Sequence, residues 1–478
     1  MSFPGGSKVI SVGLFCSMLG ILIALFLSYP NDVLVKRMNK VLNGLLEAEK
    51  FERLAPPKVA VGYGACLDLV VDAQQLLPTV DGIDARKNFD YISSMEELYQ
   101  SYSYYFQHGT AAERYISNTT LFNELITKAA SLPSSRYSVG GNAPVMATRF
   151  ALEGCSVMLA TLATPSLREK LLPELQIVGG ETSHDDIHLI LEYKADEEWG
   201  HLKAPRANRF IVHNDKNNPL IKSLEELDSN LGDFGPDLLV VSGLQMMNGY
   251  PFPSGVREER IEKIREQMNK QPSSTRIHFE MASFTEVSLL DELLSNVIPF
   301  SNSLGMNEIE LENLLSILKY GNISYVSDSN PRVATVLDQM RQVYKLITDK
   351  SRNIKNSRML TRLHVHTLAY QVILTTQPSR WKHSRAAAAR AALTAHRYIC
   401  GTSEVDVDRA KLILNESFST SRIIGSRRVS IIDDSPVSCW TESPQFEICV
   451  APVLVCTSPR QTAGGGDNIS AAGLAPQL

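Results

Sequence analysis

A glycine-rich loop near the end of the chain carries a single carboxylate. Residues 462–470 read TAGGGDNIS, with Gly464, Gly465 and Gly466 directly before Asp467. An apolar run precedes the loop and a helical pattern follows it, so the glycine N–H groups can face an anion at a helix N-terminus. Asp467 would repel a phosphate, but it can take the proton of an attacking hydroxyl. The loop therefore indicates phosphoryl transfer, and a glycine turn capped by Asp467 is the alternative.

A second set of candidate residues is acidic. An apolar strand pattern ends in His278 and Glu280, which share one strand face because strand side chains alternate. Asn307 and Glu310 open a helical pattern and share a helix face. Carboxylates at a strand end and on a nearby helix can hold Mg²⁺, usually through waters, beside substrate phosphates. Ordinary helix capping by Asn307 and Glu310 is the alternative.

A third set consists of polar groups among small residues. Asp68 lies six residues after Gly62, Glu113 follows two alanines, and Asn142 follows Gly141. Carboxylates and neutral amides near glycines suit a ligand with many hydroxyl groups, such as a sugar. Loops are commonly built in the same way, so each segment alone is weak evidence.

Short apolar runs alternate with longer segments of helical spacing. This alternation predicts an α/β domain with a mostly parallel sheet. Residues 188–193 (HLILEY) alternate in polarity, as expected of a lid strand with one wet face. The basic, alanine-rich residues 377–390 predict a solvated helix. We expect buried strands over residues 58–62, 157–160, 238–241, 276–280 and 452–456, and helices over 308–318 and 358–374.

Several classes of protein are excluded or disfavoured. No G-x-x-x-x-G-K-[ST] motif is present, which excludes a P-loop kinase. The third glycine of a dinucleotide-binding loop is missing after Gly62 and Gly64. The net charge is −5, so the basic footprint of a nucleic-acid-binding protein is absent and we expect no nucleic-acid partner.

The first 57 residues differ from the rest. Residues 9–29 carry no charge and are about long enough to cross a bilayer, so we expect residues 1–30 to be a signal or signal-anchor segment rather than a buried helix. Residues 31–57 have helical spacing and end at two prolines, which predicts a helical tether. The catalytic region should span residues 58–478. We therefore expect a protein of the secretory pathway, anchored in the endoplasmic reticulum membrane or secreted.

That compartment has two consequences for the side chains. It is oxidising, and Cys400 and Cys456 flank the region before the glycine-rich loop, so we expect them to form a disulfide. Asn118, Asn322 and Asn415 each begin an N-x-[ST] sequence and are potential glycan acceptors. None of the seven cysteines forms a C-x-x-C pair, which argues against a cysteine-rich zinc site.

Read together, these segments resemble the ADP-dependent glucokinases, including the animal forms with an N-terminal hydrophobic segment. The resemblance runs from about Val59 to Gly473, and its elements occur in one order that is highly specific as a set. The elements are residues 140–143 (GGNA), 188–210 (HLILEYKADEEWGHLKAPRANRF), 236–247 (PDLLVVSGLQMM), 278–280 (HFE), 303–311 (SLGMNEIEL), 361–370 (TRLHVHTLAY) and the 464–467 loop (GGGD).

The resemblance implies a fold and a reaction. The fold is ribokinase-like, a doubly wound α/β domain with a smaller lid. The reaction is the magnesium-dependent conversion of ADP and D-glucose to AMP and glucose 6-phosphate, and we expect a monomer. Matched to the family, Asp467 is the catalytic base, and the magnesium positions are Glu280, Glu310 and Asp467, with Asn307. The resemblance places at the sugar Asp68, Glu113, Gly141, Asn142 and His188. It places at the phosphate Arg209 and the loop of Gly464, Gly465 and Gly466, and at the nucleotide base His366, Val455 and Cys456.

Glu113 favours glucose over fructose 6-phosphate, because a carboxylate accepts hydrogen bonds from neutral hydroxyls and repels a sugar phosphate. Two positions depart from the family. Gly465 replaces a bulkier apolar residue, and Gly64 stands where the family usually has Asn. An Asn at position 64 should improve glucose binding, unless Gly64 has a positive φ that disfavours any side chain. An ATP-using kinase of the same fold and a non-catalytic binding protein are the alternatives.

Overall fold

The computed structural model describes residues 33–80, 82–323, 328, 330–442 and 445–478. The uncharged run over residues 9–29, predicted as a signal or anchor segment, lies outside the described residues. Within the described part of the chain, no helix combines the length and the apolar character needed to cross a membrane.

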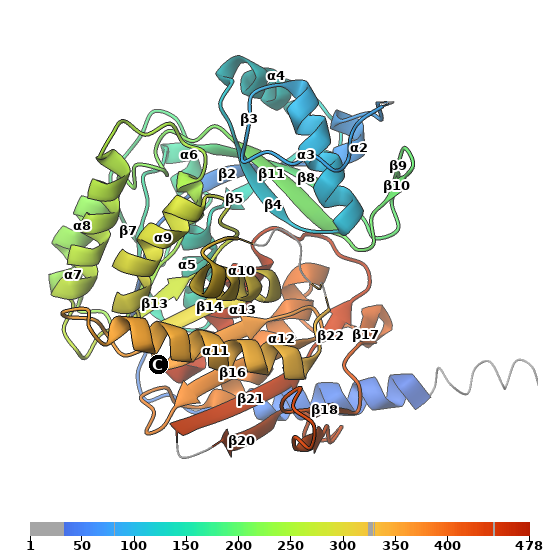
Figure 1. Ribbon diagram of the computed structural model, residues 1–478, viewed down its shortest axis with the longest axis vertical. Helices are drawn as coiled ribbons and strands as arrows, with labels where there is room; N and C mark the ends of the chain where they lie inside the picture. The colour runs from blue at the N-terminus through green and yellow to red at the C-terminus, as the bar shows by residue number, and fades with distance from the viewer. Residues whose placement is uncertain (1–32, 81, 324–327, 329, 443–444) are drawn as a thin grey trace, which may run out of the picture.

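The larger domain is built on a ten-stranded sheet (Figure 1). Strand β1 pairs in parallel with β6 on one side and β12 on the other, so the chain winds outward in both directions from β1. The strands from β7 to β15 are parallel, whereas β16, β21 and β20 are antiparallel. In spatial order they are β20 (Ser438–Glu442), β21 (Phe446–Pro452), β16 (Tyr370–Thr376), β15 (Arg362–His366), β14 (Ser303–Asn307), β13 (Arg276–Glu280), β12 (Leu238–Val241), β1 (Lys58–Gly62), β6 (Ser156–Ala160) and β7 (Gln176–Val178).

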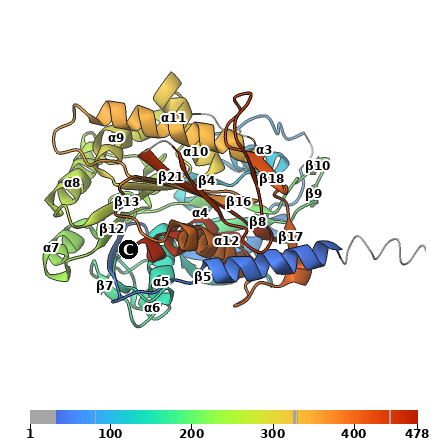
Figure 2. The ribbon, with the colours of Figure 1, turned by 90° about the horizontal axis from the view of Figure 1, so that it is seen from below.

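Helices cover both faces of this sheet, which explains why its strands are nearly continuous apolar runs (Figure 2). Ala60 packs into the core on one face, and Val59 and Val61 pack into the core on the other. The first face carries α7 (Leu224–Phe234), α8 (Val256–Lys270), α9 (Val287–Asn296), α10 (Glu308–Tyr320) and α11 (Val333–Ser351). The second carries α5 (Asn142–Leu152), α12 (Ser384–Cys400) and α13 (Gly465–Leu474).

A smaller domain, the lid, lies over one end of the large sheet (Figure 1). The chain enters it directly from β1 through β2 and returns to the large domain through α5 and again before α7. Its six-stranded sheet has the order β3 (Tyr91–Ile92), β4 (Ala112–Ile116), β11 (Asn208–His213), β8 (Ile187–Tyr193), β2 (Cys66–Asp72) and β5 (Arg136–Gly140), covered by α2 (Ala73–Leu76), α3 (Met95–His108) and α4 (Thr119–Ala130). The predicted doubly wound α/β architecture with a smaller lid is confirmed.

The shorter elements extend these two bodies. The strands β9 (Glu198–Trp199) and β10 (Leu202–Lys203) form a hairpin on the lid. The others are α6 (Pro165–Arg168), the pairs β17 (Ala410–Leu412) with β22 (Leu454–Cys456) and β18 (Ser417–Ser419) with β19 (Arg428–Ser430), and the 3₁₀ turns η1 (Leu244–Met247), η2 (Ile298–Phe300), η3 (Val407–Arg409) and η5 (Ala475–Gln477).

Two predictions of local structure are wrong. Residues 358–374 were expected to be helical, but they contain β15 and most of β16, which pair as an antiparallel hairpin. Leu363 and Val365 pack into the core on the face that carries α7 to α11, while Arg362 and His364 point to the opposite face. The side chains therefore alternate with the two-residue period of a strand. The alanine-rich segment was expected to be solvated, but α12 packs its alanines against α13 and the sheet. Small side chains permit this close approach of helices.

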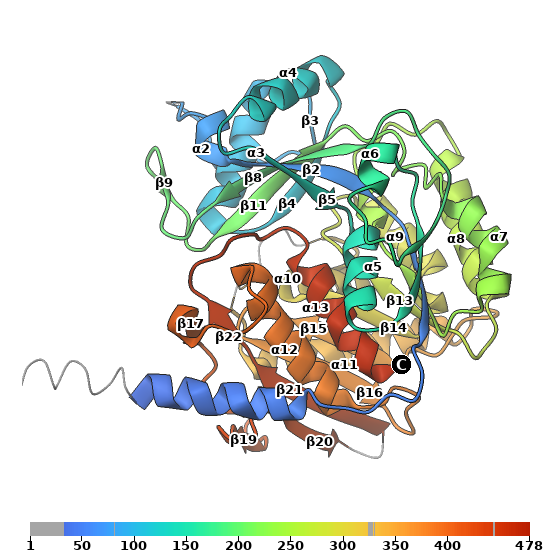
Figure 3. The ribbon, with the colours of Figure 1, turned by 180° about the vertical axis from the view of Figure 1, so that it is seen from behind.

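The segment predicted as a helical tether is helical over residues 33–48 and lies along the large domain beside α12 and β21 (Figure 3). Met38, Val41 and Leu45 are buried and belong to one apolar cluster with the alanines of α12. Gly44 lies so close to Pro436 that a Cβ there would meet its Cδ at 2.4 Å. The helix is thus part of the folded body.

Two disulfides are present. The predicted bond between Cys400 and Cys456 forms, with Cα atoms 5.7 Å apart. A second, which the sequence did not suggest, joins Cys439 to Cys449, directly opposite each other on β20 and β21. Among the described residues, Cys66 and Cys155 are the free cysteines.

Replacing Leu45 by Ala should destabilise the protein, because Leu45 is 1% exposed in the interface with α12. Truncation of a buried leucine typically lowers the free energy of unfolding by about 2–5 kcal/mol. The matched control is Leu34→Ala on the same helix, where the side chain is 43% exposed and the expected change is within about 0.5 kcal/mol. Urea denaturation of both variants measures the difference, and equal midpoints would contradict the packing of this helix.

Candidate active site

The carboxyl ends of three adjacent parallel strands bring polar side chains together. Glu280 ends β13, Asn307 ends β14 and His366 ends β15. Asn307 is paired with His366 across β14 and β15, and Glu280 is paired with Gly305 across β13 and β14. Ligands of open parallel sheets bind outside this edge, so the three side chains mark a candidate site.

The N-terminus of α13 points into the same place. Gly464 precedes the helix with φ +69°, a left-handed conformation that glycine adopts without strain. Asp467 is in the first turn, and Ser470 one turn later donates a 2.6 Å hydrogen bond from Oγ to Oε2 of Glu280. Gly466 lies against the ring of His366, which a Cβ would approach to 3.0 Å. The predicted loop and the predicted acidic strand end therefore meet.

The carboxylates of this site differ in their protonation. Burial alone would raise the pKa of Glu280, but the hydrogen bond from His278, 2.8 Å long, and the nearby His366 ring lower it to about 2. Burial raises the pKa of Asp467 to about 7, and the negative charge of Glu280 adds to the rise. Burial likewise raises the pKa of Glu310 to about 7. The three acidic groups thus interact, because the charge of Glu280 raises the pKa values of both Glu310 and Asp467.

Asn307 and Glu310 form a capping box at the start of α10. The Asn307 side chain accepts hydrogen bonds from the backbone N–H groups of Ile309 and Glu310, each 2.9 Å long. The Glu310 carboxylate accepts in return from the backbone N–H of Asn307 at 2.9 Å. The capping interpretation of these residues is therefore correct, and the cap also fixes the Glu310 carboxylate beside the strand ends.

The lid presents a polar face to the large domain because its strands alternate. On β8, Leu189 and Leu191 pack with the lid helices, whereas His188 and Glu192 point to the opposite face. The partner strands follow the same register, with Arg209 of β11 opposite Glu192. This face carries Asp68 of β2, Glu113 of β4, His188 of β8 and Arg209 of β11, the predicted sugar and phosphate residues of the lid.

A network of two carboxylates and two imidazoles lies on this face. His188 Nε2 is 3.0 Å from Asp215 Oδ2, and His188 Nδ1 is 3.4 Å from Glu113 Oε1. His213 Nδ1 is 3.2 Å from the other oxygen of Asp215. Burial lowers the pKa of His188, but the Asp215 carboxylate outweighs this effect and the net pKa rises to about 10, so the imidazole stays charged at neutral pH. The buried Glu113 Oε1 lies 3.4 Å from His188 Nδ1 and 3.8 Å from His213 Nε2 but accepts no hydrogen bond within the described structure, so a ligand hydroxyl can donate to it.

Asp68 packs directly on a glycine pair. A Cβ on Gly140 would meet Asp68 Oδ1 at 1.9 Å, and a Cβ on Gly141 would meet the carbonyl oxygen of Gly64 at 2.3 Å. Gly141 has φ +84° and leads into α5, whose first residue is Asn142. Both glycines are required by close approach, and burial raises the pKa of the Asp68 carboxyl to about 6.

Asn142 links the lid side to the catalytic loop. Its Nδ2 donates a 2.8 Å hydrogen bond to Asp467 Oδ1, and its Oδ1 accepts a 2.8 Å bond from Gln245 Nε2. Arg209 lies near both carboxyl groups. Burial raises the pKa values of Asp68 and Asp467, and the positive charge of Arg209 partly offsets this rise. Its buried Nε makes no hydrogen bond within the described structure, which leaves a donor for an anion.

The residues predicted to hold a nucleotide base lie on strands β15 and β22. Val455 and Cys456 lie on β22, and Cys456 is tied to Cys400 by the disulfide. The backbone N–H of Val453 donates to the Ala369 carbonyl at 2.9 Å, three residues after His366. Gly465 has little free space, since a Cβ would meet Ile399 Cδ1 at 3.0 Å.

The site also contains residues that the sequence did not reveal. Gln245, which orients Asn142, follows β12 in η1. His213 is the last residue of β11 and Asp215 follows it, and Asp215 is fully buried. The polar segment HND directly after an apolar strand was the available signal for them.

The structure changes the expectation for Gly64. Its φ is +78°, and a Cβ there would meet Met246 Sδ at 2.9 Å and the Gly243 backbone at 3.1 Å. An Asn side chain at this position has no open path toward a sugar without displacing its neighbours. The reservation about a positive φ therefore applies, and the expected gain in glucose binding loses its basis.

Gly64→Asn should lower the free energy of unfolding by about 1–3 kcal/mol, because it combines left-handed backbone strain with the clash against Met246. Gly235→Asn is the matched control, since Gly235 has φ +60° with nothing within 4 Å of a Cβ and Asn tolerates this conformation. Denaturant midpoints compare the two. Equal losses would show that the crowding around Gly64 has no effect.

Comparisons with known proteins show the family of this chain. The family model described as the ADP-specific phosphofructokinase/glucokinase conserved region matches residues 57–476. The ADP-dependent glucokinase of Bos taurus is 35% identical over 87% of this chain and 84% of its own length, and the probable ADP-dependent glucokinase of Caenorhabditis elegans is 27% identical over the same shares. An ADP-dependent kinase solved with fructose-6-phosphate and ADPβS shares the fold, with a TM-score of 0.67 and 19% identity over 92% of this chain and 97% of that one. The chain belongs to the ADP-specific phosphofructokinase/glucokinase family.

Proposed function

We propose that this protein transfers a phosphoryl group from ADP to the 6-hydroxyl of D-glucose, giving glucose 6-phosphate and AMP. The two glucokinase relatives support the reaction. The observation that carries it is the Asp467 carboxylate, partly buried at the N-terminus of α13 and joined through Asn142 to the side of the lid that carries Asp68. A general base, a helix N-terminus that can bind an anion and a polar face that can bind a sugar thus lie close together.

The chain's own residues supply most of the chemistry. Asp467 takes the proton of the sugar hydroxyl as the new oxygen–phosphorus bond forms and the bond to the AMP oxygen breaks. The N–H groups of Gly464, Gly465 and Gly466 and the unpartnered donor of Arg209 hold the transferring phosphate. His366, Val455 and Cys456 are proposed to border the nucleotide base. All proposed residues lie on one chain, so a monomer suffices.

The donor set fits a magnesium ion. Glu280 and Glu310 are buried and Asp467 is partly buried, and burial raises the pKa values of Glu310 and Asp467. Hard cations prefer such oxygen ligands, with Asn307 completing the group. When bound, Mg²⁺ supplies positive charge beside the phosphates.

Glu113 favours glucose as the acceptor over fructose 6-phosphate. Its carboxylate faces the same space as Asp68, and the two imidazoles near it are already held by Asp215. The open acceptor on Glu113 suits a neutral hydroxyl, whereas a second negative charge there would be repelled.

A coupled assay of sugar phosphate formation by the full chain tests the function. We expect the highest kcat/KM with ADP and glucose. Preference for ATP would support the ATP-dependent alternative, and preference for fructose 6-phosphate would remove the role of Glu113. Binding of glucose and ADP without turnover would support a non-catalytic protein.

Asp467→Asn should lower kcat by about 10²–10⁴-fold with little effect on nucleotide binding, since the amide keeps the shape and removes the base. Steady-state kinetics and ADP titration measure the two quantities. Asp434→Asn is the control, because the Asp434 side chain is exposed and is not one of the proposed site residues. A mutant that keeps more than about a tenth of the wild-type kcat is inconsistent with general base catalysis by Asp467.

Glu280→Gln and Glu310→Gln should each raise the half-activating Mg²⁺ concentration by roughly 10-fold or more, because each removes a negative charge from the metal site. Glu312→Gln, one turn of α10 away from the strand ends, should leave it unchanged. Activity titrated against free Mg²⁺ makes the comparison. Unchanged titrations in both site variants would mean that the carboxylates are structural.

We also propose that the chain enters the secretory pathway and is held at the endoplasmic reticulum membrane or secreted. The uncharged residues 9–29 motivate this proposal. Two disulfides support it, because such bonds persist in oxidising compartments. The glycan acceptors Asn118 and Asn415 are both exposed.

In microsomes prepared from expressing cells, the body of the protein should resist added protease until detergent opens the membrane. Immunoblotting against a segment of the large domain measures this protection. A resident lumenal protein and a cytosolic protein serve as controls. Complete digestion without detergent would place the body in the cytosol.

A further inference from the structure

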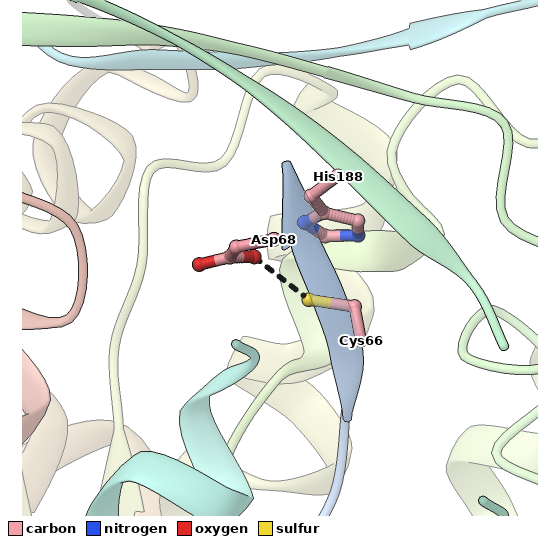
Figure 4. Close-up of side chains that lie close together, drawn as sticks. All are labelled: Cys66, Asp68 and His188. Atoms are coloured by element: carbon pink, nitrogen blue, oxygen red, sulfur yellow. Dashed lines mark hydrogen bonds between the residues drawn. The ribbon is translucent and has the colours of Figure 1, made fainter. Parts of the chain in front are cut away.

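A thiol, a carboxylate and an imidazole converge on the polar face of the lid. Cys66 and Asp68 are two residues apart on β2, so they share a face, and His188 is the cross-strand neighbour of Asp68 on β8 (Figure 4). Cys66 Sγ donates to Asp68 Oδ1 at 3.2 Å. One ligand atom of each residue lies within 4.8 Å of the other two, and all three side chains are buried. A single ion can bridge atoms at these separations.

The orientation of His188 is that of a metal ligand. Its Nε2 lies 3.0 and 3.1 Å from the two oxygens of Asp215, which leaves Nδ1, now 3.4 Å from Glu113 Oε1, as the nitrogen that a cation can bind. Asp215 is itself fixed by a 2.7 Å hydrogen bond from Asn218 Nδ2. A carboxylate behind a histidine fixes its tautomer and strengthens it as a ligand, which is the usual outer arrangement of protein metal sites.

We propose that Cys66, Asp68 and His188 form a site for Zn²⁺, and that Zn²⁺ in this site excludes glucose. One sulfur, one oxygen and one nitrogen ligand match the preferences of zinc and leave a fourth position open. Mg²⁺ is a hard cation that prefers oxygen ligands, so the thiol separates this site from the magnesium site near Asp467. Binding releases the thiol proton of Cys66 and the Nδ1 proton of His188 to solvent.

The neighbouring group of His188, His213 and Asp215 is the competing location for a metal. Its ligand atoms are also close together, but Asp215 already pairs with both imidazoles. A cation there would have to displace these pairings. At the proposed site, a cation replaces the weak hydrogen bond from the thiol and the 3.4 Å contact between His188 Nδ1 and Glu113 Oε1, and the pairs of Asp215 stay intact.

The metal site stands on geometry alone, whereas the exclusion of glucose rests on the proposed function, which places Asp68 and His188 at the sugar. The first experiment therefore needs no activity. Co²⁺ is the probe, because a cobalt–thiolate bond gives a near-ultraviolet charge-transfer band. Titration of the full chain should produce this band. It should be absent in Cys66→Ser and retained in Cys155→Ser, the matched control at the other free cysteine of the described residues.

The second experiment measures initial rates with free Zn²⁺ fixed by a metal buffer and Mg²⁺ in excess. Zn²⁺ should raise the KM for glucose with little change in kcat. Cys66→Ser keeps a hydroxyl beside Asp68, so its kinetics without Zn²⁺ should stay within about 2-fold of wild type. Its inhibition constant for Zn²⁺ should rise at least about 10-fold, as loss of a metal-site interaction typically requires. Cys66→Ala provides a second variant, and circular dichroism confirms that each is folded.

Each outcome is decisive for one part of the proposal. A cobalt band that is absent from wild type or retained in Cys66→Ser overturns the metal site, as does Zn²⁺ inhibition of equal strength in both proteins. A band that depends on Cys66, together with inhibition that glucose does not relieve, overturns the exclusion of glucose. If the chain does not phosphorylate glucose at all, the proposed function fails while the cobalt result still tests the metal site.

Discussion

The repulsion among three carboxyl groups, two of them buried and one partly buried, is the constraint around which the candidate site is arranged. Glu280, Glu310 and Asp467 come from a strand end, a helix start and a glycine-rich loop, and each is held by different partners. His278 and Ser470 stabilise the charge of Glu280, whereas Glu310 and Asp467 remain with raised pKa values. Burying charges in this way is unfavourable unless a cation or a proton compensates. A bound cation or proton would therefore explain why these carboxyl groups lie together.

The two sheets present polar side chains from opposite sides, so that they can surround a polar substrate. The parallel sheet delivers its side chains at strand ends, while the lid sheet delivers them from the middle of its strands. The lid can do so because most apolar residues of its strands face α2, α3 and α4, which leaves the other face mainly for polar groups. Thr462 beside the glycine-rich loop donates from its N–H and Oγ1 to Glu192 of the lid, each at 3.1 Å, so the two bodies also contact each other beside the loop that carries Asp467.

The polar face of the lid is itself crowded with acidic groups, and this crowding connects sugar recognition with the proposed zinc site. Asp68, Glu113 and Asp215 surround His188, whose charge is retained because of them. A neutral sugar can donate hydroxyls to the acceptors that remain open. A thiophilic cation can use the same acceptors with Cys66. In the two proposals, one cluster thus serves two kinds of ligand whose binding is mutually exclusive.

The sequence by itself determined features that depend on neighbouring residues. Strand β12 follows from four consecutive apolar residues, the capping box of Asn307 and Glu310 from their three-residue spacing, and the Asp467 loop from its glycines. Resemblance added the placement of Asp68, Glu113 and His188, which the structure gathers on one face of the lid.

Only the tertiary structure decided what depends on contacts between distant segments. It pairs His188 with Asp215, sets Gln245 against Asn142, and closes the Cys439–Cys449 bond across two strands. It also buries the alanines of α12, because a second helix covers them, and folds residues 362–376 as a hairpin, because the adjacent strands accept its hydrogen bonds. Local periodicity does not specify which element lies opposite, and burial and hydrogen bonding are determined by that neighbour.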